Sequence, residues 1–258
     1  MILDDIVADT KKALEDIKLN MPLNKLNEMA FARTGTKSLA QALTDNNIKL
    51  ITEVKKASPS KGVICHNFDP VTMAQTYATN GAAAISVLTE EKYFQGSLDY
   101  LKDIRDKLGE DRPPLLRKDF IFDPYQVFQA RAYGADCLLL IAAILSPTNM
   151  KYLLDLSHDL GMDCLAEVHD EKELETVLAS DARIIGINNR NLRTFKTDIN
   201  ITKRLKKLIP DDRIVVSESG IGSKEDIIEL QSYGITNFLV GEALTASPNI
   251  SAKMRQLL

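Results

Sequence analysis

The chain has 258 residues, of which 45% are hydrophobic and 26% charged, and its formal net charge is −4. This composition predicts a globular protein with a substantial core, and it lacks the basic stripe that most nucleic-acid-binding proteins carry. Cys65, Cys137 and Cys164 are scattered and form no CxxC pair, which favours a reduced intracellular chain. No pair of histidines has the spacing of metal ligands, so we expect no zinc site.

The N-terminal segment predicts a helix and no targeting or membrane segment. Residues 3–17, LDDIVADTKKALEDI, have apolar residues at helical spacing but lack the basic start and the long apolar run of a signal peptide. No stretch approaches the roughly 18 apolar residues that a membrane-spanning helix needs. We therefore expect a cytoplasmic protein without membrane or nucleic-acid partners.

Eight short apolar runs follow, most of them after helix-patterned segments. Most are continuously apolar rather than alternating, which is typical of strands buried on both faces, as in a parallel sheet. The runs are KLITEV (49–54), AAAISVL (82–88), PLLRK (114–118), DCLLLIA (136–142), DCLAEV (163–168), RIIGIN (183–188), RIVVSE (213–218) and NFLVG (237–241).

Four of the segments between these runs end in a glycine, and a strand follows each within a few residues. Glycine tolerates the left-handed conformation that often closes a helix. Ser146-Pro147 and the pair Ser223 and Asp226 have the spacing of helix starts. The four segments are 69–81, 123–134, 146–161 and 223–234, which close with Gly81, Gly134, Gly161 and Gly234.

The repeated β-then-α order predicts an α/β protein of one domain, a (β/α)8 TIM barrel over residues 49–258. Residues 1–48 are predicted to be an extension with one added helix packed on that barrel, and no linker rich in Pro, Gly or Ser separates the two. An open doubly wound sheet is the alternative. The G-x-G-x-x-G fingerprint that would favour it is absent after the first strand.

Charged and polar residues stand at the ends of five predicted strands, where such barrels carry their catalytic groups. Glu53 and Lys55 share one face, because side chains alternate along a strand. Any one of these charges alone is more simply a structural ion pair, but two acids and two bases at one mouth predict an acid–base site. The strand-end residues are Glu53, Lys55, Lys118, Glu167, Asn188, Arg190, Glu218 and Ser219.

Small residues after the last two strands suggest a phosphate site. SESGIG follows the seventh strand and VGEAL the eighth, so backbone N–H groups near Gly220 and Gly241 could approach an anion. Each glycine alone is a weak indication, since turns often contain one. A short helix beginning at Glu242 would add its dipole through the backbone, while the Glu242 carboxylate would repel phosphate. Ser58, after the first strand, could add a hydroxyl.

Seven motifs occur in an order that resembles the indole-3-glycerol phosphate synthase family over nearly the whole chain. They are EVKKASPSKG, SVLTEEKYFQGS, LLRKDFI, LAEVH, IGINNRNL, SESGI and FLVGEAL. The resemblance implies a carboxy-lyase of tryptophan biosynthesis that needs no metal or organic cofactor. Its substrate would be a phosphorylated anilino-sugar, 1-(2-carboxyphenylamino)-1-deoxyribulose 5-phosphate, and its products indole-3-glycerol phosphate, CO2 and water. We expect the protein to be a monomer.

The resemblance also implies roles for individual residues. Lys118 matches the lysine that protonates the substrate ketone during ring closure, and Lys55 matches a residue that contacts the substrate carboxylate and acts as the acid in dehydration. Glu53 and Glu167 match their acidic partners, and the division of work between these two stays open. The other matches are Asn188 and Arg190 as orienting residues, Phe94, Phe120, Leu192 and Leu239 as apolar walls, Ser58, Gly220, Gly241 and Glu242 as the phosphate cradle, and Glu218 and Ser219 as further substrate contacts.

Two other functions fit the predicted fold. A barrel like phosphoribosylanthranilate isomerase would use a cysteine and an aspartate as base and acid, but no cysteine stands at the end of the first or second strand. A non-catalytic barrel that only binds a phosphorylated ligand could dispense with the lysines, whereas Lys55 and Lys118 are both present.

Overall fold

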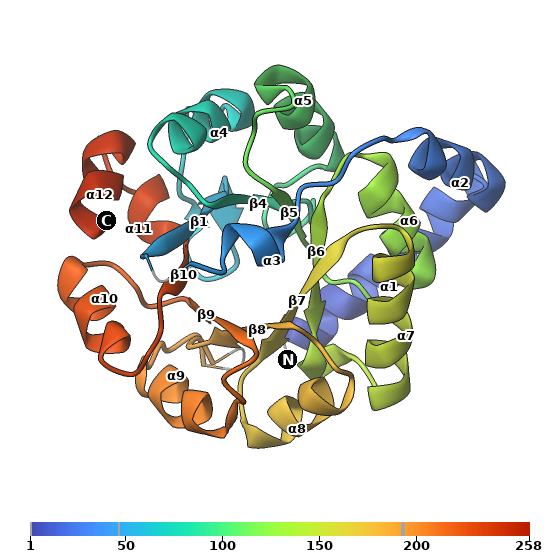
Figure 1. The fold of residues 1–258 in the computed structure, drawn as a ribbon. Helices are drawn as coiled ribbons and strands as arrows, with labels where there is room; N and C mark the ends of the chain where they lie inside the picture. The colour runs from blue at the N-terminus through green and yellow to red at the C-terminus, as the bar shows by residue number, and fades with distance from the viewer. Residues whose placement is uncertain (1, 46, 192–193) are drawn as a thin grey trace.

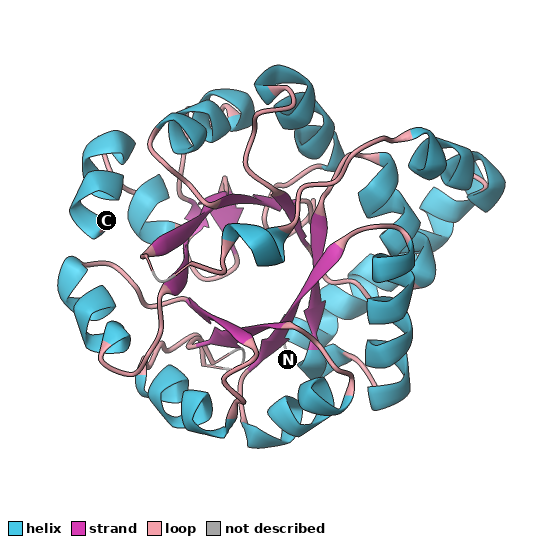
Figure 2. Cartoon of the chain, viewed as in Figure 1, coloured by secondary structure: helices cyan, strands magenta, loops and turns pink. Residues whose placement is uncertain are grey.

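The computed structural model describes residues 2–45, 47–191 and 194–258. In this part of the chain, eight parallel strands close into a barrel in the order β1-β10-β9-β8-β7-β6-β5-β4, and helices surround it (Figure 1, Figure 2). The predicted (β/α)8 barrel is confirmed, and each strand lies within the run predicted for it. The strands are β1 Lys49–Val54, β4 Ala84–Leu88, β5 Leu115–Lys118, β6 Cys137–Ile141, β7 Asp163–Val168, β8 Ile184–Asn188, β9 Ile214–Glu218 and β10 Asn237–Val240.

The helices outside the barrel begin and end largely as the sequence predicts. Ser146 caps one helix with Pro147 in its first turn, and Ser223 and Asp226 form a capping box at another. The four predicted closing glycines all have positive φ. The helices are α4 Pro70–Thr79, α5 Leu98–Leu108, α6 Pro124–Ala132, α7 Pro147–Asp159, α8 Glu171–Ala179, α9 Asn200–Leu205, α10 Lys224–Gln231, α11 Glu242–Thr245 and α12 Ile250–Leu257, with 3-10 turns η1 Ala142–Ile144 and η2 Lys206–Leu208.

The N-terminal extension differs from the single added helix that the sequence predicts. It contains α1 Ile2–Asn20, α2 Leu23–Ala32 and α3 Leu39–Ala42. Helix α2 packs on α6, and α3 covers the end of the barrel where the strands begin (Figure 1). Leu39 and Leu43 join the apolar core inside the barrel. The extension therefore closes the base of the barrel as well as adding a helix to its side.

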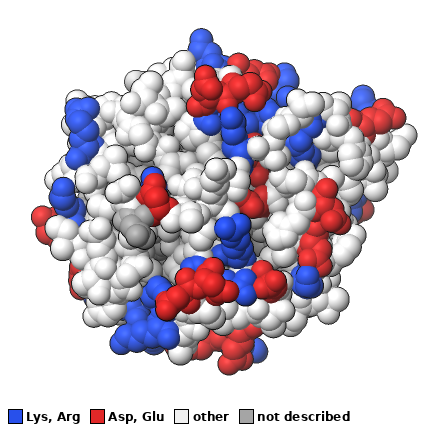
Figure 3. All heavy atoms as spheres, in the orientation of Figure 1, with Lys and Arg blue, Asp and Glu red and all other residues white. Residues whose placement is uncertain are grey.

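Positive and negative side chains lie interspersed on the face that carries α3 (Figure 3). None of the described helices is both long and apolar enough to cross a membrane.

Candidate active site

A layer of four charged side chains lies inside the barrel near the carboxyl ends of the strands. It comes from β1, β5, β7 and β9, the alternate strands that supply one layer of a barrel core. Two residues earlier in each strand an apolar side chain faces the same interior, because side chains alternate along a strand. The pairs, apolar then charged, are Ile51 and Glu53, Leu116 and Lys118, Leu165 and Glu167, and Val216 and Glu218.

Two glycines, one inside β8 and one directly after β10, make room for this charged layer. A Cβ atom at Gly186 would collide with the Glu218 carboxylate, and one at Gly241 would collide with the Glu53 carboxylate. Gly186, in the middle of β8, is not among the predicted site residues, although a glycine inside a strand often marks a close approach of another group. Gly241, predicted as a phosphate contact, also has this spacing role.

Gly186→Ala is expected to displace the Glu218 side chain and so disturb the charged layer. Misplacing one group of an acid–base site commonly costs on the order of 10-fold or more in rate. Overpacking of a filled interior should also lower stability by about 1–3 kcal/mol. Steady-state kcat and thermal unfolding check both effects. Wild-type kcat in the alanine variant would show that Glu218 needs no fixed position.

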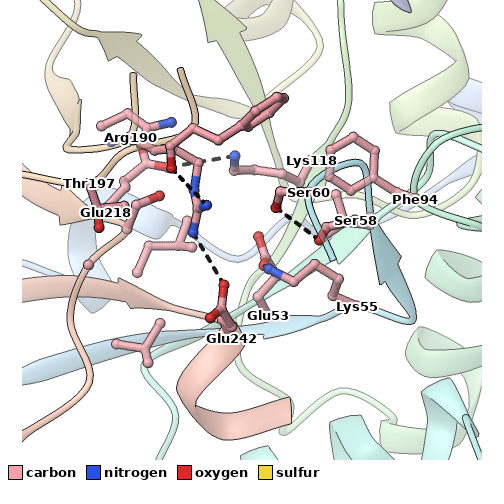
Figure 4. A pocket seen from close by; sticks show the side chains of 18 of the residues that line it. Glu53, Lys55, Ser58, Ser60, Phe94, Lys118, Arg190, Thr197, Glu218 and Glu242 are labelled. Carbon is pink, nitrogen blue, oxygen red and sulfur yellow. Dashed lines mark hydrogen bonds and ion pairs between the residues drawn. The ribbon is translucent and has the colours of Figure 1, made fainter. Parts of the chain in front are cut away.

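The charged residues are paired across the layer (Figure 4). Lys118 Nζ lies 3.3 Å from Glu167 Oε2 and 3.7 Å from Glu218 Oε2. Lys55 Nζ lies 2.5 Å from Glu53 Oε1. The structure thus brings together the four predicted acids and bases, and Glu218, predicted as a strand-end residue and substrate contact, joins them as a third carboxylate.

These contacts push the pKa values of the carboxylates apart. Burial raises the pKa of Glu167, but the charges of Lys118 and His169 outweigh it and hold that pKa well below its usual range. Burial and the charge of Glu167 raise the pKa of Glu218 to about 8. Burial lowers the pKa of Lys118, but Glu167 and Glu218 raise it above its usual value. The layer therefore favours an ionised Glu167 and a cationic Lys118, while Glu218 is the carboxyl that most readily holds a proton, the separation expected of paired acids and bases.

Glu53 is ionised for a similar reason. Burial raises its pKa, but the charges of Lys55 and Lys118 outweigh burial and lower it. Its backbone carbonyl accepts a hydrogen bond of 3.1 Å from the buried Tyr77 hydroxyl. Glu53 is thus fixed at both its backbone and its carboxylate.

A cavity of about 470 Å³ opens above the charged layer. Phe94 and Phe120 give it an aromatic wall, with ring centroids 6.2 Å apart and ring planes at 39°. The predicted Leu192 lies outside the described residues. All the other predicted site residues line the cavity, namely Glu53, Lys55, Ser58, Phe94, Lys118, Phe120, Glu167, Asn188, Arg190, Glu218, Ser219, Gly220, Leu239, Gly241 and Glu242.

The loops after β9 and β10 supply the small-residue part of the cavity. Ser219 and Gly220 both have left-handed backbone, with φ of 64° and 77°, so the chain turns sharply at the end of β9. Gly241 precedes α11, the short helix that begins at Glu242 as predicted. The backbone of these two loops therefore borders the cavity without bulky side chains.

The Glu242 carboxylate is held by two cations. Arg190 lies 3.3 Å from it, and Lys61 from the loop after β1 also forms an ion pair with it. Burial raises the pKa of Glu242, but these two cations lower it overall. The charge of the side chain expected to repel phosphate is thus balanced by two cations, and Lys61 is a partner of Glu242 that the sequence did not indicate.

The N-terminal helix completes the cavity. Ile2, Leu3 and Ile6 of α1 line it. Asp9 holds the helix in place, since it accepts hydrogen bonds of 2.7 Å from Lys92 and 2.6 Å from the Tyr93 hydroxyl. The extension is therefore part of the site.

The fold and the site define an enzyme that applies acid–base chemistry to a small ligand in the mouth of a (β/α)8 barrel. The sequence profile described as "Indole-3-glycerol phosphate synthase" matches residues 3–257. The chain is 56% identical over 259 residues to the indole-3-glycerol phosphate synthase of Dehalococcoides mccartyi strain CBDB1, with 100% of both chains covered. It is 48% identical to that of Roseiflexus sp. strain RS-1, covering 99% of this chain and 97% of the relative. The chain belongs to the indole-3-glycerol phosphate synthase family.

Solved structures show the same fold at much lower identity. KGPDC from Streptococcus mutans aligns with a TM-score of 0.60 at 15% identity, covering 82% of this chain and 96% of that one. The 3-hexulose-6-phosphate synthase from Salmonella typhimurium aligns with a TM-score of 0.65 at 11% identity, covering 81% and 96%. These likenesses concern the barrel alone.

Membership of the family establishes the function. The chain is an indole-3-glycerol phosphate synthase of tryptophan biosynthesis, a decarboxylating carbon–carbon lyase that acts on a small phosphorylated substrate. The family match favours this function over the isomerase-like and the non-catalytic alternatives.

Proposed function

We propose that the charged layer and Lys55 divide the three stages of this reaction, which are ring closure, decarboxylation and dehydration. The observation that carries the proposal is the position of Lys118, which lies between Glu167 and Glu218 on the floor of the cavity. A single ammonium group there can give up a proton, while the neighbouring carboxylates stabilise its charged form and a protonated carboxyl can restore the proton afterwards.

The cavity offers a place for each part of the substrate. The aromatic ring fits against Phe94, Phe120 and Leu239, the apolar part of the lining. The phosphate belongs at Ser58 and at the backbone of the loops 219–220 and 241–242. Lys55 contacts the substrate carboxylate, while Asn188 and Arg190 orient the sugar chain, and Ser219 and Glu218 add polar contacts.

Ring closure requires an acid at the ketone. The ring carbon that carries the carboxylate attacks the ketone carbon, and the electrons of the C=O bond move to its oxygen. Lys118 donates a proton to that oxygen, which becomes a hydroxyl, and Lys118 becomes neutral. One of the two cations beside Glu167 is then lost, so Glu167 becomes a stronger base for the later step.

Decarboxylation and dehydration follow. The electrons of the bond to the carboxylate return to the ring as CO2 leaves, which restores aromaticity. Lys55 protonates the departing hydroxyl, and a carboxylate removes a proton from the adjacent carbon as the second ring becomes aromatic. We assign that base role to Glu167, because Glu53 is occupied with Lys55 at 2.5 Å. Glu218, protonated by its surroundings, can return a proton to Lys118.

The direct test is product formation from the purified anilino-sugar substrate. Indole fluorescence should appear with the purified protein and no added cofactor, and a chelator should leave the rate unchanged. Fluorescence that required an added metal or organic cofactor would contradict the proposal that the chain's own residues suffice.

Ser58→Ala tests the phosphate assignment. A hydrogen bond to a charged group contributes about 1.5–3 kcal/mol, so its loss should raise KM on the order of 10-fold to 100-fold. The effect on kcat should be small, because Ser58 contacts a part of the substrate that does not react. Initial rates over a range of substrate concentration give both constants. An unchanged KM in a folded variant would place the phosphate away from the loop after β1.

We further propose a monomer of one domain that works in the cytoplasm without nucleic-acid partners. The chain's own α1 completes the cavity, so the site needs no second copy. A doubly charged phosphorylated substrate does not cross membranes, which favours the compartment where it is made. Sedimentation equilibrium with and without substrate would check the oligomeric state.

A further inference from the structure

His169 lies one residue beyond the end of β7, between two carboxylates. Its Nε2 is 3.3 Å from Glu167 Oε1, and its Nδ1 is 3.0 Å from Glu173 Oε2. Only 13% of its side chain is exposed. His169 follows Glu167 by two positions at the end of a strand, so both side chains point to the same side. None of the proposed reaction steps transfers a proton to or from His169.

Glu173 fixes His169 to the outer layer of the barrel. The same Glu173 oxygen that faces the imidazole also accepts the backbone N–H of His169 at 2.8 Å. The backbone N–H of Glu173 in turn donates to the Asp170 carboxylate at 2.9 Å, which caps the first turn of α8. Glu173 is therefore held by the start of a helix, and it holds both the backbone and the ring of His169.

The two carboxylates determine the charge of the imidazole. Nδ1 is within hydrogen-bond geometry of Glu173, whereas Nε2 contacts Glu167 at ion-pair distance but outside hydrogen-bond geometry. A neutral imidazole has one N–H and one lone pair, so one of its nitrogens would present a lone pair to a nearby carboxylate oxygen. Only the doubly protonated ring presents an N–H to both sides. Burial alone would lower the pKa of His169, but Glu167 and Glu173 raise it to about 10.

We propose that His169 is a positioning residue, a permanent cation that is anchored to α8 through Glu173 and that orients the catalytic carboxylate of Glu167. Of the two Glu167 carboxylate oxygens, Oε1 faces His169 and Oε2 faces Lys118. This inference rests on the base role proposed for Glu167.

His169 should matter most for the basicity of Glu167 after Lys118 has given its proton to the substrate. Glu167 then faces one remaining cation, His169, together with the neutral Asn188 and the nearby Glu53 and Glu218. Without His169 the carboxylate would face no cation there, only Asn188 and the acids Glu53 and Glu218. Its pKa would rise, and it would be protonated, and so useless as a base, over a wider range of low pH.

His169→Gln is the informative variant, because glutamine can still donate one hydrogen bond but carries no charge. We expect kcat at neutral pH to fall on the order of 10-fold, as for other misplaced catalytic groups, with little change in KM. The low-pH limb of the kcat profile should move to higher pH. Glu173→Gln should move it in the same direction by less, and should add nothing in the His169→Gln background, because the two residues act in series. Glu175→Gln, an exposed change on the same helix, should keep the wild-type profile.

A direct measurement of the imidazole charge gives a second readout. Nitrogen NMR of the wild-type protein, with the His169 signals assigned by their loss in His169→Gln, should show both ring nitrogens protonated at pH 8. A neutral imidazole at that pH would overturn the inference, as would a His169→Gln kcat profile that superimposes on the wild type. If His169→Gln fails to fold, the His169 signals can be assigned by elimination with His66→Gln and His158→Gln, and that spectrum together with Glu173→Gln still decides.

The failure of this inference is distinguishable from a failure of the proposed mechanism. Normal kcat in Glu167→Gln would remove the base role of Glu167, whatever the charge of His169. An inactive Glu167→Gln beside an unaffected His169→Gln would leave the mechanism in place and reject only the positioning role.

Discussion

Replacing Lys118 with Met is expected to lower kcat by on the order of 10²–10⁴, the usual cost of losing a positioned general acid. The loss should reach the upper end or more, because the ammonium group that stabilises the charge developing on the ketone oxygen is lost as well. Methionine keeps most of the apolar stem, so the cavity keeps its shape. Substrate binding should weaken far less than the rate, since the phosphate and aromatic contacts lie elsewhere in the cavity.

A matched variant separates the charge of Lys118 from its proton. Lys118→Arg keeps a cation beside Glu167 and Glu218 but does not release a proton in proteins. It should retain stability better than Lys118→Met and still turn over slowly. Single-turnover product formation and titration with a substrate analogue measure rate and binding for each variant. Near-normal turnover in Lys118→Met would move the acid role to Lys55, and an equal loss of binding and rate would make Lys118 a substrate anchor.

The predictable part of this protein follows from local patterns. Continuous apolar runs and closing glycines are properties of single segments, and they located all the strands of the barrel. The charged layer was also predictable in part, since Glu53, Lys118 and Glu167 each end an apolar run and a barrel aligns such ends at one mouth. The family motifs then supplied the substrate, which the spacing of the residues alone could not.

The parts that were missed depend on contacts between distant segments. Helix α3 has only 4 residues, too few for a periodic pattern, and its burial depends on the open base of the barrel. Leu3 and Ile6 belong to the predicted apolar face of a helix, and nothing local shows that this face lines the cavity. The raised pKa of Glu218 arises from burial and from Glu167, which lies far away in sequence.

Gly186 and His169, which the sequence did not indicate as site residues, each have a local sequence feature whose meaning depends on the structure. Gly186 interrupts a run of isoleucines in the strand IIGIN. The carboxylate that occupies the space beside it is that of Glu218, which belongs to β9. His169 and Glu173 have the i,i+4 spacing of a helical pair, although the histidine precedes α8. In both cases the reason for the residue lies on a neighbouring element, which the sequence pattern of one segment cannot indicate.

Glu167→Gln is expected to lower kcat strongly, on the order of 10²–10⁴ for a lost general base, with little change in the melting temperature. Glutamine keeps the size of the side chain but neither the charge nor the ability to accept a proton. Stability should hold because Glu218 can replace the lost charge. Its pKa is raised partly by Glu167, so it should fall in the variant, and an ionised Glu218 would then pair with Lys118, which already lies 3.7 Å away. Steady-state kinetics and thermal unfolding at neutral pH test both halves of the expectation. A large drop in melting temperature with normal kcat would instead identify Glu167 as a structural partner of Lys118 and His169, and the base role would pass to Glu53.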